Sequence, residues 1–297
     1  METLKALLSY GAAIIALPPL VIGLINKTKA FVGGRKGPPI LQSFHDNLKL
    51  LRKSAVYGQT TGWVFKVGPV ASLSAVLMAA ALTPFFGAPL FSFNGDAVLF
   101  IFLLSLVHFT AVLAALDTGS SLEGMGASRA VSFSTLSDLA LILVFANLAF
   151  QCGSLSLKDM FSPHDFKLMA GTLTIGSLFI LTLAENSRIP IDDPQTHLEL
   201  TMIHEVMTLD HGGPDLGFIS YAAQLKLALM SALIARLMIS HLTIQEFAPM
   251  FLLAFSIVAV LIGLIESSMA RLRMNRAPQL LVAAACASAL GLIVNFQ

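Results

Sequence analysis

Charged residues are scarce in this sequence of 297 residues. Asp, Glu, Lys and Arg together make up 12% of it, whereas 56% of the residues are hydrophobic. Soluble domains carry about 25% charged residues, so this composition is typical of a chain that lies in a bilayer. We therefore expect an all-α integral membrane protein. The formal net charge is +1 and no basic tract stands apart, so no nucleic-acid partner is indicated.

Cysteine is equally rare. The two cysteines, Cys152 and Cys286, lie far apart in apolar surroundings. They form no CxxC pair and no ligand set for zinc, an iron–sulfur cluster or nickel. We therefore expect no metal and no cofactor in this chain, and any redox centre has to lie on another subunit.

Two further signals are missing. The opening stretch, METLKALLSYGAAIIALPPLVIGLIN, is too long and too loosely flanked for a cleaved signal peptide, and we interpret it as the first membrane span. No internal repeat is evident, so the inverted-repeat architecture of many secondary transporters gains no support.

Long apolar stretches account for most of the chain. Stretches of about 18 to 25 mostly apolar residues can cross a bilayer as helices. Eight of them lie near residues 3–25, 67–87, 96–116, 131–152, 166–184, 216–240, 247–268 and 279–296. We expect a single membrane domain over residues 1–297 with about eight transmembrane helices.

Basic residues are distributed unevenly over the connections between these spans. Alternate connections hold thirteen Lys and Arg, whereas the remaining ones hold two, Lys158 and Lys167. Because basic connections stay in the cytoplasm, we expect the richer set there and both termini outside a bacterial or archaeal cytoplasmic membrane. The connections expected in the cytoplasm are 26–66, 117–130, 185–215 and 269–278.

The first of these connections contains an amphipathic pattern. In ILQSFHDNLKLLRKS (40–54), apolar residues recur near one helical face and basic residues lie elsewhere. The pattern predicts a surface helix. We interpret it as a helix at the membrane interface, where basic side chains suit anionic headgroups, and docking of a partner is the alternative.

Several ionisable residues lie within the predicted spans. Such a residue costs about 2.5–3.5 kcal/mol on insertion scales, so each is a candidate functional residue. Lys226 is placed near mid-bilayer, and we expect it to face a carboxylate such as Asp138, either in a polar ion path or in an ion pair that only fixes packing. His108 is interpreted as a hydrogen-bonded packing residue, and Arg236 and Glu266 as anchors near span ends.

Titratable residues are concentrated in AENSRIPIDDPQTHLELTMIHEVMTLDHGGPD (184–215), which contains seven of the seventeen acidic residues and three of the seven histidines. Pro190 and Pro194 interrupt any continuous helix there. Broken backbone at membrane depth is tolerated only where it lines a cavity or is buried in protein. We therefore expect a cavity beside this connection.

After Pro194 the pattern predicts a helix of about four turns that closes at Gly212–Gly213. His197, His204 and His211 recur every seven residues on one side of it, but their rings would lie about 10 Å apart along the axis, too far to share one metal ion. The acidic residues alternate with apolar ones, which favours partly desolvated carboxylates whose protonation responds to a nearby change of charge. A solvated acidic loop is the alternative.

Three motifs carry a resemblance to a known family. GRKGPP (34–39) with LQSFHDNLKLLRK (41–53), LDTGSSLEGMGASRAVSFSTLSDLA (116–140) and AENSRIPIDDPQTHLEL (184–200) resemble the membrane subunit that closes the quinone chamber of respiratory complex I, and its hydrogenase relatives. The second motif and THLELTMIHEVMTLDHGGP resemble more closely the subgroup in group 4 [NiFe]-hydrogenases and formate hydrogenlyase-type complexes.

The resemblance implies a subunit without redox centres that docks a hydrophilic redox module and couples electron transfer to proton or sodium movement. The implied partners are hydrogenase-like large and small subunits, an iron–sulfur subunit and antiporter-like membrane subunits, with a nickel–iron site and iron–sulfur clusters on those partners. The residues that we expect in the ion path, because charge is clustered there beside broken helices or lies within a span, are Glu185, Asp192, Asp193, Glu199, Glu205, Asp210, Asp138 and Lys226. The residues implied in docking or in tuning these charges are Arg35, Asp46, Lys49, Arg129 and Arg188.

The sequence departs from the complex I pattern at two positions. Gln195 and His197 stand where that pattern has two Glu, which argues mildly against a quinone-reducing enzyme. The same subunit in a respiratory NADH dehydrogenase is nevertheless one alternative. A stand-alone ion transporter that uses Lys226 and Asp138, and an anchor whose acidic residues only dock a partner, are two others.

Overall fold

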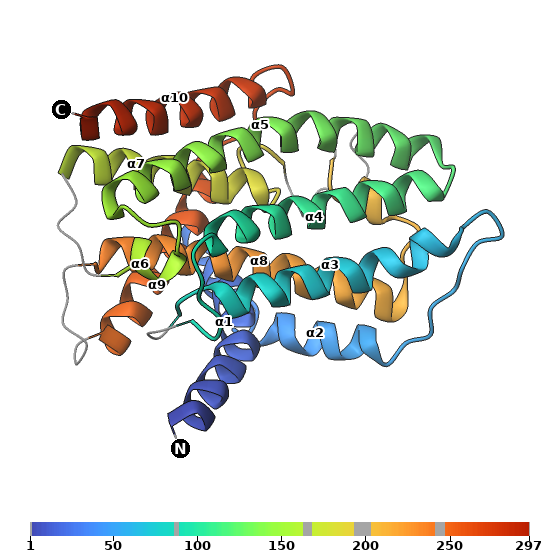
Figure 1. Ribbon diagram of the computed structural model, residues 1–297. Coiled ribbons are helices and arrows are strands. Elements are labelled where there is room, and N and C mark those ends of the chain that lie inside the picture. Colours follow the sequence, from blue (N-terminus) through green and yellow to red (C-terminus); the bar gives the residue numbers. More distant parts are fainter. Residues whose placement is uncertain (1, 86–88, 163–167, 193–202, 241–246, 297) are drawn as a thin grey trace.

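The apolar stretches fold into long helices, because backbone N–H and C=O groups in a bilayer must be bonded within the chain. The computed structural model describes residues 2–85, 89–162, 168–192, 203–240 and 247–296, and it contains no strand within these ranges (Figure 1). The α-helices are α1 (Glu2–Val32), α2 (Gln42–Leu51), α3 (Trp63–Leu82), α4 (Asp96–Asp117), α5 (Ser121–Cys152), α6 (Leu157–Met160), α7 (Leu168–Glu185), α8 (Gly213–Met238), α9 (Phe247–Ser268) and α10 (Ala277–Phe296).

Seven helices, α1, α3, α4, α5, α8, α9 and α10, are long and apolar enough to cross a membrane. The apolar part of α7, Met169–Glu185, is shorter. The expected all-α integral membrane protein is confirmed. The number of eight spans and the side on which the termini lie stay predictions.

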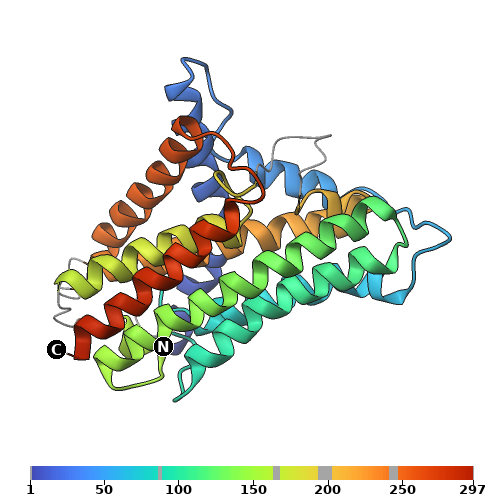
Figure 2. The same ribbon diagram turned by 90° about the horizontal axis from the view of Figure 1, so that it is seen from above.

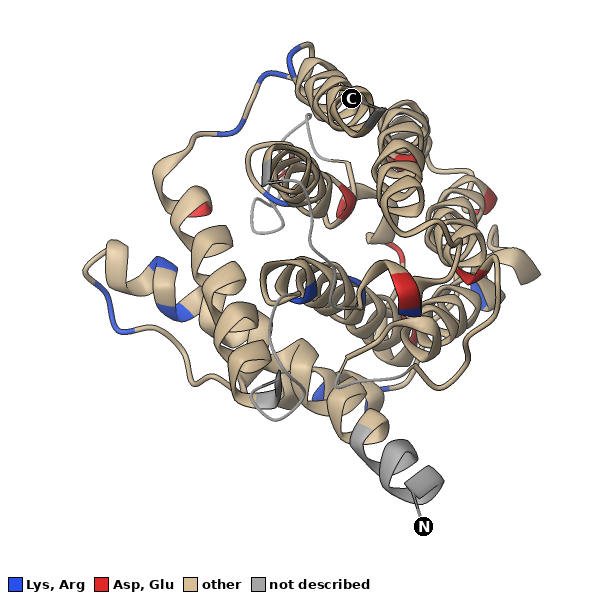
Figure 3. Cartoon of the chain, turned by 60° about the vertical axis from the view of Figure 1, so that its left-hand side comes forward, with Lys and Arg blue, Asp and Glu red and all other residues tan. Residues whose placement is uncertain are grey.

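Helices α3, α4, α5, α7 and α10 run side by side, α1 crosses them steeply, and α8 lies in the middle of the bundle (Figures 1 and 2). Helix α8 packs against α1, α3, α7 and α9. Its span is 67% buried, whereas the other six candidate spans are 28% to 44% buried. Charged residues are few along the chain (Figure 3). One of them, Lys226, lies on α8 and is buried in the protein.

The surface helix predicted over 40–54 is confirmed as α2. It packs against α8 through polar contacts, because both Ser43 Oγ and Asn47 Nδ2 donate hydrogen bonds to Gln224 Oε1, at 2.6 and 3.2 Å. Leu41 and Leu48 are exposed on the outside. This apolar outer face suits the membrane interface and a partner surface alike.

Two expectations about the connections differ from the structure. Helix α5 already begins at Ser121, so its first turns occupy most of the predicted connection 117–130; their polar side chains concealed them from a reading based on hydropathy. The four-turn helix expected after Pro194 is wrong over 203–212, which form turns and a short 3₁₀-helix, η1 (Val206–Thr208).

Side chains explain why no α-helix forms at the end of this connection. Asp192 Oδ2 accepts hydrogen bonds from the backbone N–H groups of Ile203 and His204, at 3.2 and 3.1 Å, and Glu123 Oε1 accepts one from Asp210. Such bonds satisfy backbone donors outside a helix. The remainder of the predicted helix, 193–202, lies outside the described residues.

Helices α1 and α9 approach closely at Gly263. A Cβ atom added there would lie 2.8 Å from Thr28 Cβ and 3.1 Å from the Ile25 carbonyl oxygen. Small residues permit such close helix contacts in membranes. The contact matters for the site described below, because α1 and α9 supply Lys29 and Glu266.

We predict that Gly263→Ala lowers the melting temperature of the purified chain in detergent, because the added methyl group forces α1 and α9 apart. Gly176→Ala in α7 is the matched control, since nothing lies within 4 Å of its added Cβ. Thermal unfolding followed by circular dichroism measures both. Equal melting temperatures for the two variants would show that the α1–α9 contact adapts without cost.

Candidate functional site

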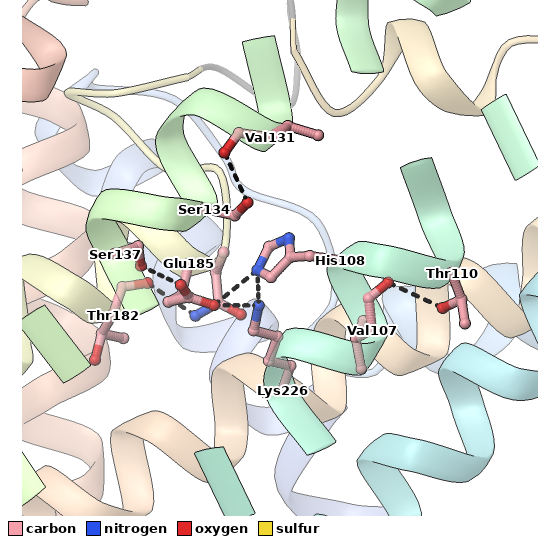
Figure 4. Close-up of polar contacts among 10 residues, drawn as sticks. Val107, His108, Thr110, Val131, Ser134, Ser137, Thr182, Glu185 and Lys226 are labelled. Carbon is pink, nitrogen blue, oxygen red and sulfur yellow. Dashed lines mark hydrogen bonds and ion pairs between the residues drawn. The ribbon is translucent and has the colours of Figure 1, made fainter. Parts of the chain in front are cut away.

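Four helices place polar side chains at one point inside the bundle (Figure 4). His108 comes from α4, Ser137 from α5 and Lys226 from α8, and Glu185 is the last residue of α7. Figure 4 shows the side chains pointing toward one another, with the Glu185 carboxylate between the other three. We call these four residues the inner cluster.

The Glu185 carboxylate is fully engaged. Its Oε2 lies 2.6 Å from Lys226 Nζ and 2.8 Å from His108 Nε2, while Ser137 Oγ donates to its Oε1. The side chains of Glu185 and Lys226 are only 1% and 4% exposed. Because an isolated charge is very costly in such surroundings, each of these two groups requires the other.

The geometry offers a proton two places to reside. His108 Nε2 also lies 2.7 Å from Lys226 Nζ, so the two nitrogens and Glu185 Oε2 form a triangle. A charged Lys226 can donate to the imidazole, or a charged His108 can donate to the carboxylate beside a neutral amine. The inner cluster can therefore shift a proton between Lys226 and His108 while the carboxylate stays ionised.

Asp138 is not the partner of Lys226 that the sequence suggested. Its neighbour Ser137 is buried against Glu185, whereas Asp138 is half-buried. Successive residues on a helix point about 100° apart, so only one of the two can face α7 directly. Asp138 still lies close enough to interact electrostatically with Glu185, His108 and Lys226.

A second group of charges lies around Glu266. Its Oε2 is 2.9 Å from Lys29 Nζ and its Oε1 is 3.1 Å from Arg188 Nη1, with the Glu266 side chain fully buried. Arg236 is also buried and donates to the Phe161 carbonyl oxygen at 2.9 Å. Glu266 and Arg236, interpreted from the sequence as anchors near span ends, are both buried in protein.

Asp192 joins the two ends of the connection that follows α7. Its Oδ1 accepts a hydrogen bond from Arg271 Nη2 at 2.8 Å, and its Oδ2 accepts the backbone N–H groups of Ile203 and His204. The backbone N–H of Leu272 also donates to the Pro190 carbonyl oxygen at 2.9 Å. The segment between α9 and α10 therefore holds this connection in place.

The cavity predicted beside the broken connection is present, and a second one adjoins it. The inner cavity is lined by residues that include His108, Glu185 and Lys226, and its volume is about 100 Å³. The outer cavity is lined by residues that include Arg188, Glu205 and Gln224, and its volume is about 250 Å³. Both exceed the roughly 10–15 Å³ that one water molecule needs.

Two histidines of the connection line the inner cavity. Burial, followed by the nearby positive charges of His108 and Lys226, lowers the pKa of His204 to about 4. Burial also lowers the pKa of His211, whose ring stacks on Phe65 with centroids 3.8 Å apart. Both imidazoles are thus neutral near pH 7. No cluster of three or more His, Cys, Asp or Glu that could hold a metal ion occurs among the described residues.

The remaining predicted residues lie farther from the inner cluster. Arg35, Asp46 and Lys49 are exposed on α2 or just before it. Arg129 is half-buried on α5, with its Nη2 3.2 Å from Met125 Sδ. Asp210 is exposed. Asp193 and Glu199 lie outside the described residues.

Sequence reasoning missed His108, Ser137, Glu266, Arg271 and His204 as members of the site. His108 and Glu266 are ionisable residues within predicted spans. The free-energy cost of placing such residues in a bilayer had therefore already identified them as candidates. Arg271 was counted only as one of several basic residues of its connection. His204 was visible only as part of the histidine repeat. Ser137 gives no signal of its own, because its role depends on which helices meet.

Comparison with known proteins identifies the family. The NADH dehydrogenase family matches residues 4–296. The chain belongs to this family. The expected resemblance to the membrane subunit shared by complex I and related hydrogenases is thereby confirmed.

The similar proteins include hydrogenase subunits and complex I subunits. Hydrogenase-4 component C of Escherichia coli is 29% identical over 86% of this chain and 81% of its own length. Formate hydrogenlyase subunit 4 of the same organism is 26% identical over 92% of each chain. NADH-ubiquinone oxidoreductase chain 1 of Triticum aestivum is 26% identical over 63% of each chain. The alignments with the two hydrogenase-type proteins thus span more of the chain.

A solved structure shows the same fold. A chain of the membrane-bound sulfane sulfur reductase, an archaeal respiratory membrane complex, superimposes with a TM-score of 0.80 at 21% identity. The superposition covers 99% of this chain and 100% of the other. The shared fold therefore extends over nearly the whole chain, including α9 and α10.

We predict that Lys226→Met destabilises the chain by about 3–5 kcal/mol, because it leaves the buried Glu185 carboxylate without its counter-charge. The double variant Lys226→Met with Glu185→Gln removes both charges and should recover most of this loss. Unfolding in detergent measures the double-mutant cycle. Additive effects of the two substitutions would contradict a coupled pair.

We also predict that the chain loses stability as the pH falls from about 6.5 to about 4, the ordinary and folded-state pKa values of His204. The unfolded chain binds a proton at His204 in this range and the folded chain does not, so acid favours unfolding. His204→Gln should make the dependence of the melting temperature on pH shallower. His45→Gln, which alters an exposed histidine on α2, is the control and should not.

Proposed function

We propose that this chain is the non-catalytic membrane subunit of a complex I-like energy-converting hydrogenase. The observation that carries the proposal is the inner cluster: a buried carboxylate and amine with an imidazole, all within 2.8 Å of one another beside a cavity, at the start of the broken connection. The two hydrogenase-type relatives support the choice of complex, since their alignments cover 86% and 92% of the chain.

The redox chemistry in this proposal belongs to partner subunits. These are hydrogenase-like large and small subunits and an iron–sulfur subunit, which would carry the nickel–iron site and the iron–sulfur clusters, together with antiporter-like membrane subunits. Hydrogenase-4, formate hydrogenlyase and an archaeal respiratory membrane complex, named among the similar proteins, support such an assembly. The exposed Arg35, Asp46 and Lys49 are proposed to face the docked redox module.

Coupling in this proposal is electrostatic. Electron transfer changes the charge of the docked module, and the ion pairs of Arg188 and Arg271 transmit this change to the connection between Glu185 and Asp192. A shift in potential of this kind alters the balance between a proton on Lys226 and one on His108. Asp138, Glu205 and Asp210 would extend the path on either side, as would Asp193 and Glu199.

A quinone-reducing enzyme is the second candidate. NADH-ubiquinone oxidoreductase chain 1 is also among the similar proteins. Its alignment covers 63% of this chain, less than the alignments of the two hydrogenase-type relatives. Hydrogen turnover by the purified complex would support the hydrogenase assignment. Inhibition of its redox activity by quinone-site ligands would favour the quinone enzyme.

We predict that Glu185→Gln uncouples the complex. In inverted membrane vesicles, the rate of ΔpH formation should fall by about 100-fold or more, the lower end of the range for lost acid–base groups, while hydrogen turnover with a viologen dye persists. Quenching of an acridine dye and gas chromatography measure the two rates. The double variant with Lys226→Met serves where Glu185→Gln alone fails to assemble.

The control for this experiment is Asp159→Asn, which makes the same carboxylate-to-amide change at an exposed position on α6. It should pump normally. An unchanged ratio of ΔpH formation to hydrogen turnover in both the single and the double variant would exclude the inner cluster from coupling.

A further inference from the structure

His204 occupies the boundary between the two cavities. It is among the residues that line the inner cavity and also among those that line the outer one. Only the inner cavity reaches His108, Glu185 and Lys226. Water in either cavity can therefore contact this residue.

The backbone of His204 is held firmly while its ring is left available. Its N–H donates to Asp192, which in turn is fixed by Arg271. Among the residues that the structure describes, the imidazole makes no hydrogen bond, whereas His108 and His45 each make one or more. Both ring nitrogens of His204 are thus available to water in the adjoining cavities.

The charges around His204 keep its imidazole neutral. Burial and the positive charges of His108 and Lys226 hold its pKa near 4. A neutral imidazole has one N–H donor and one acceptor nitrogen, so it can take a proton on one side and release another on the opposite side. The titratable and charged groups that line the cavities beside it are His108 from α4, Glu185 from α7, Lys226 from α8, and Arg188, Asp192, Glu205 and His211 from the connection.

We propose that the His204 imidazole passes protons between the outer and inner cavities, and that the ion moved at the inner cluster is accordingly H⁺ and not Na⁺. This proposal rests on the proposed coupling function and deepens it. The site is poorly built for Na⁺, which would need a shell of oxygen ligands, because both Glu185 oxygens are already engaged by Ser137, Lys226 and His108.

The transfer balances without any further reactant. A proton from water in the outer cavity bonds to the acceptor nitrogen and gives an imidazolium. The original N–H proton then leaves for water in the inner cavity and reaches His108 or Lys226. The ring becomes neutral again as the other tautomer. Rotation of the ring then brings its N–H back to the inner side and its acceptor nitrogen back to the outer side, so that the next proton can pass. No electron is transferred.

The test uses the whole complex reconstituted in liposomes with His204→Gln, which keeps a polar side chain but cannot relay a proton. ΔpH formation driven by hydrogen turnover should fall by about 100-fold or more, while hydrogen turnover in the presence of an uncoupler stays near that of the unmodified complex. Imidazole added to the buffer should restore part of the rate. His204→Asn serves as a second variant where the first does not assemble.

The control is His45→Gln, which removes an exposed histidine on α2 and should leave both rates unchanged. A second arm varies the cation. ΔpH formation should be the same with and without Na⁺, and ²²Na⁺ should not accumulate. Full ΔpH formation by both His204 variants would overturn the relay, and accumulation of ²²Na⁺ would overturn the assignment of H⁺.

The outcome is separable from that of the proposed function. If Glu185→Gln abolishes ΔpH formation and the His204 variants do not, the inner cluster couples but receives its proton by another route. If neither substitution has an effect, both proposals fail. A purely structural role for His204 would reduce assembly and hydrogen turnover together, and imidazole would not restore ΔpH formation, which also overturns the relay.

Discussion

The ion pair between Glu185 and Lys226 is the constraint on which the rest of the site depends. Two opposite charges, 2.6 Å apart and almost fully buried, are tolerable inside a membrane protein only when each stays with its partner. α7 must therefore end where α8 passes, and both helices must pack tightly there. His108 and Ser137 complete the bonding of the carboxylate, so α4 and α5 are drawn to the same point.

The broken connection after α7 follows from this arrangement. A helix that ends inside the bundle leaves backbone groups that require partners. The ion pairs of Glu266 with Lys29 and Arg188, and of Asp192 with Arg271, anchor the returning chain on α1, α9 and the segment beyond α9. The cost of the interruption is thus offset by charges that hydropathy alone would place at a surface, and the cavities remain beside the anchored segment.

The sequence was sufficient for the class of fold, because long apolar runs have few alternatives to transmembrane helices. It also pointed to Lys226 and to the connection 184–215, since charges within apolar surroundings are costly wherever they occur. It did not reveal that Lys226 pairs with Glu185 in place of Asp138. That choice depends on the rotation of α5, and two adjacent residues differ by about 100° around a helix.

Other features of the site arise from contacts between distant segments. No local pattern relates Arg271 to Asp192, and the turns at 203–212 replace a helix only because Asp192 and Glu123 bind backbone N–H groups there. The histidine period in 197–211 suggested a shared helical face. In the structure His204 and His211 do line the same cavity, but through a turn, so a correct grouping came from an incorrect element.

The short chain segment between the two groups of charges gives coupling a physical basis. Glu185, Arg188 and Asp192 lie within the eight residues ENSRIPID (185–192). Each of the three side chains is bonded to a different partner helix or segment. A force on Arg188 from a charge at the bundle end therefore acts on a backbone that terminates at the Glu185 carboxylate. Because that carboxylate borders Lys226 and His108 at 2.6 and 2.8 Å, even a small displacement changes which nitrogen holds the proton more strongly. A rigid helix through this point would have spread the same force over many residues, and the interruption concentrates it on one.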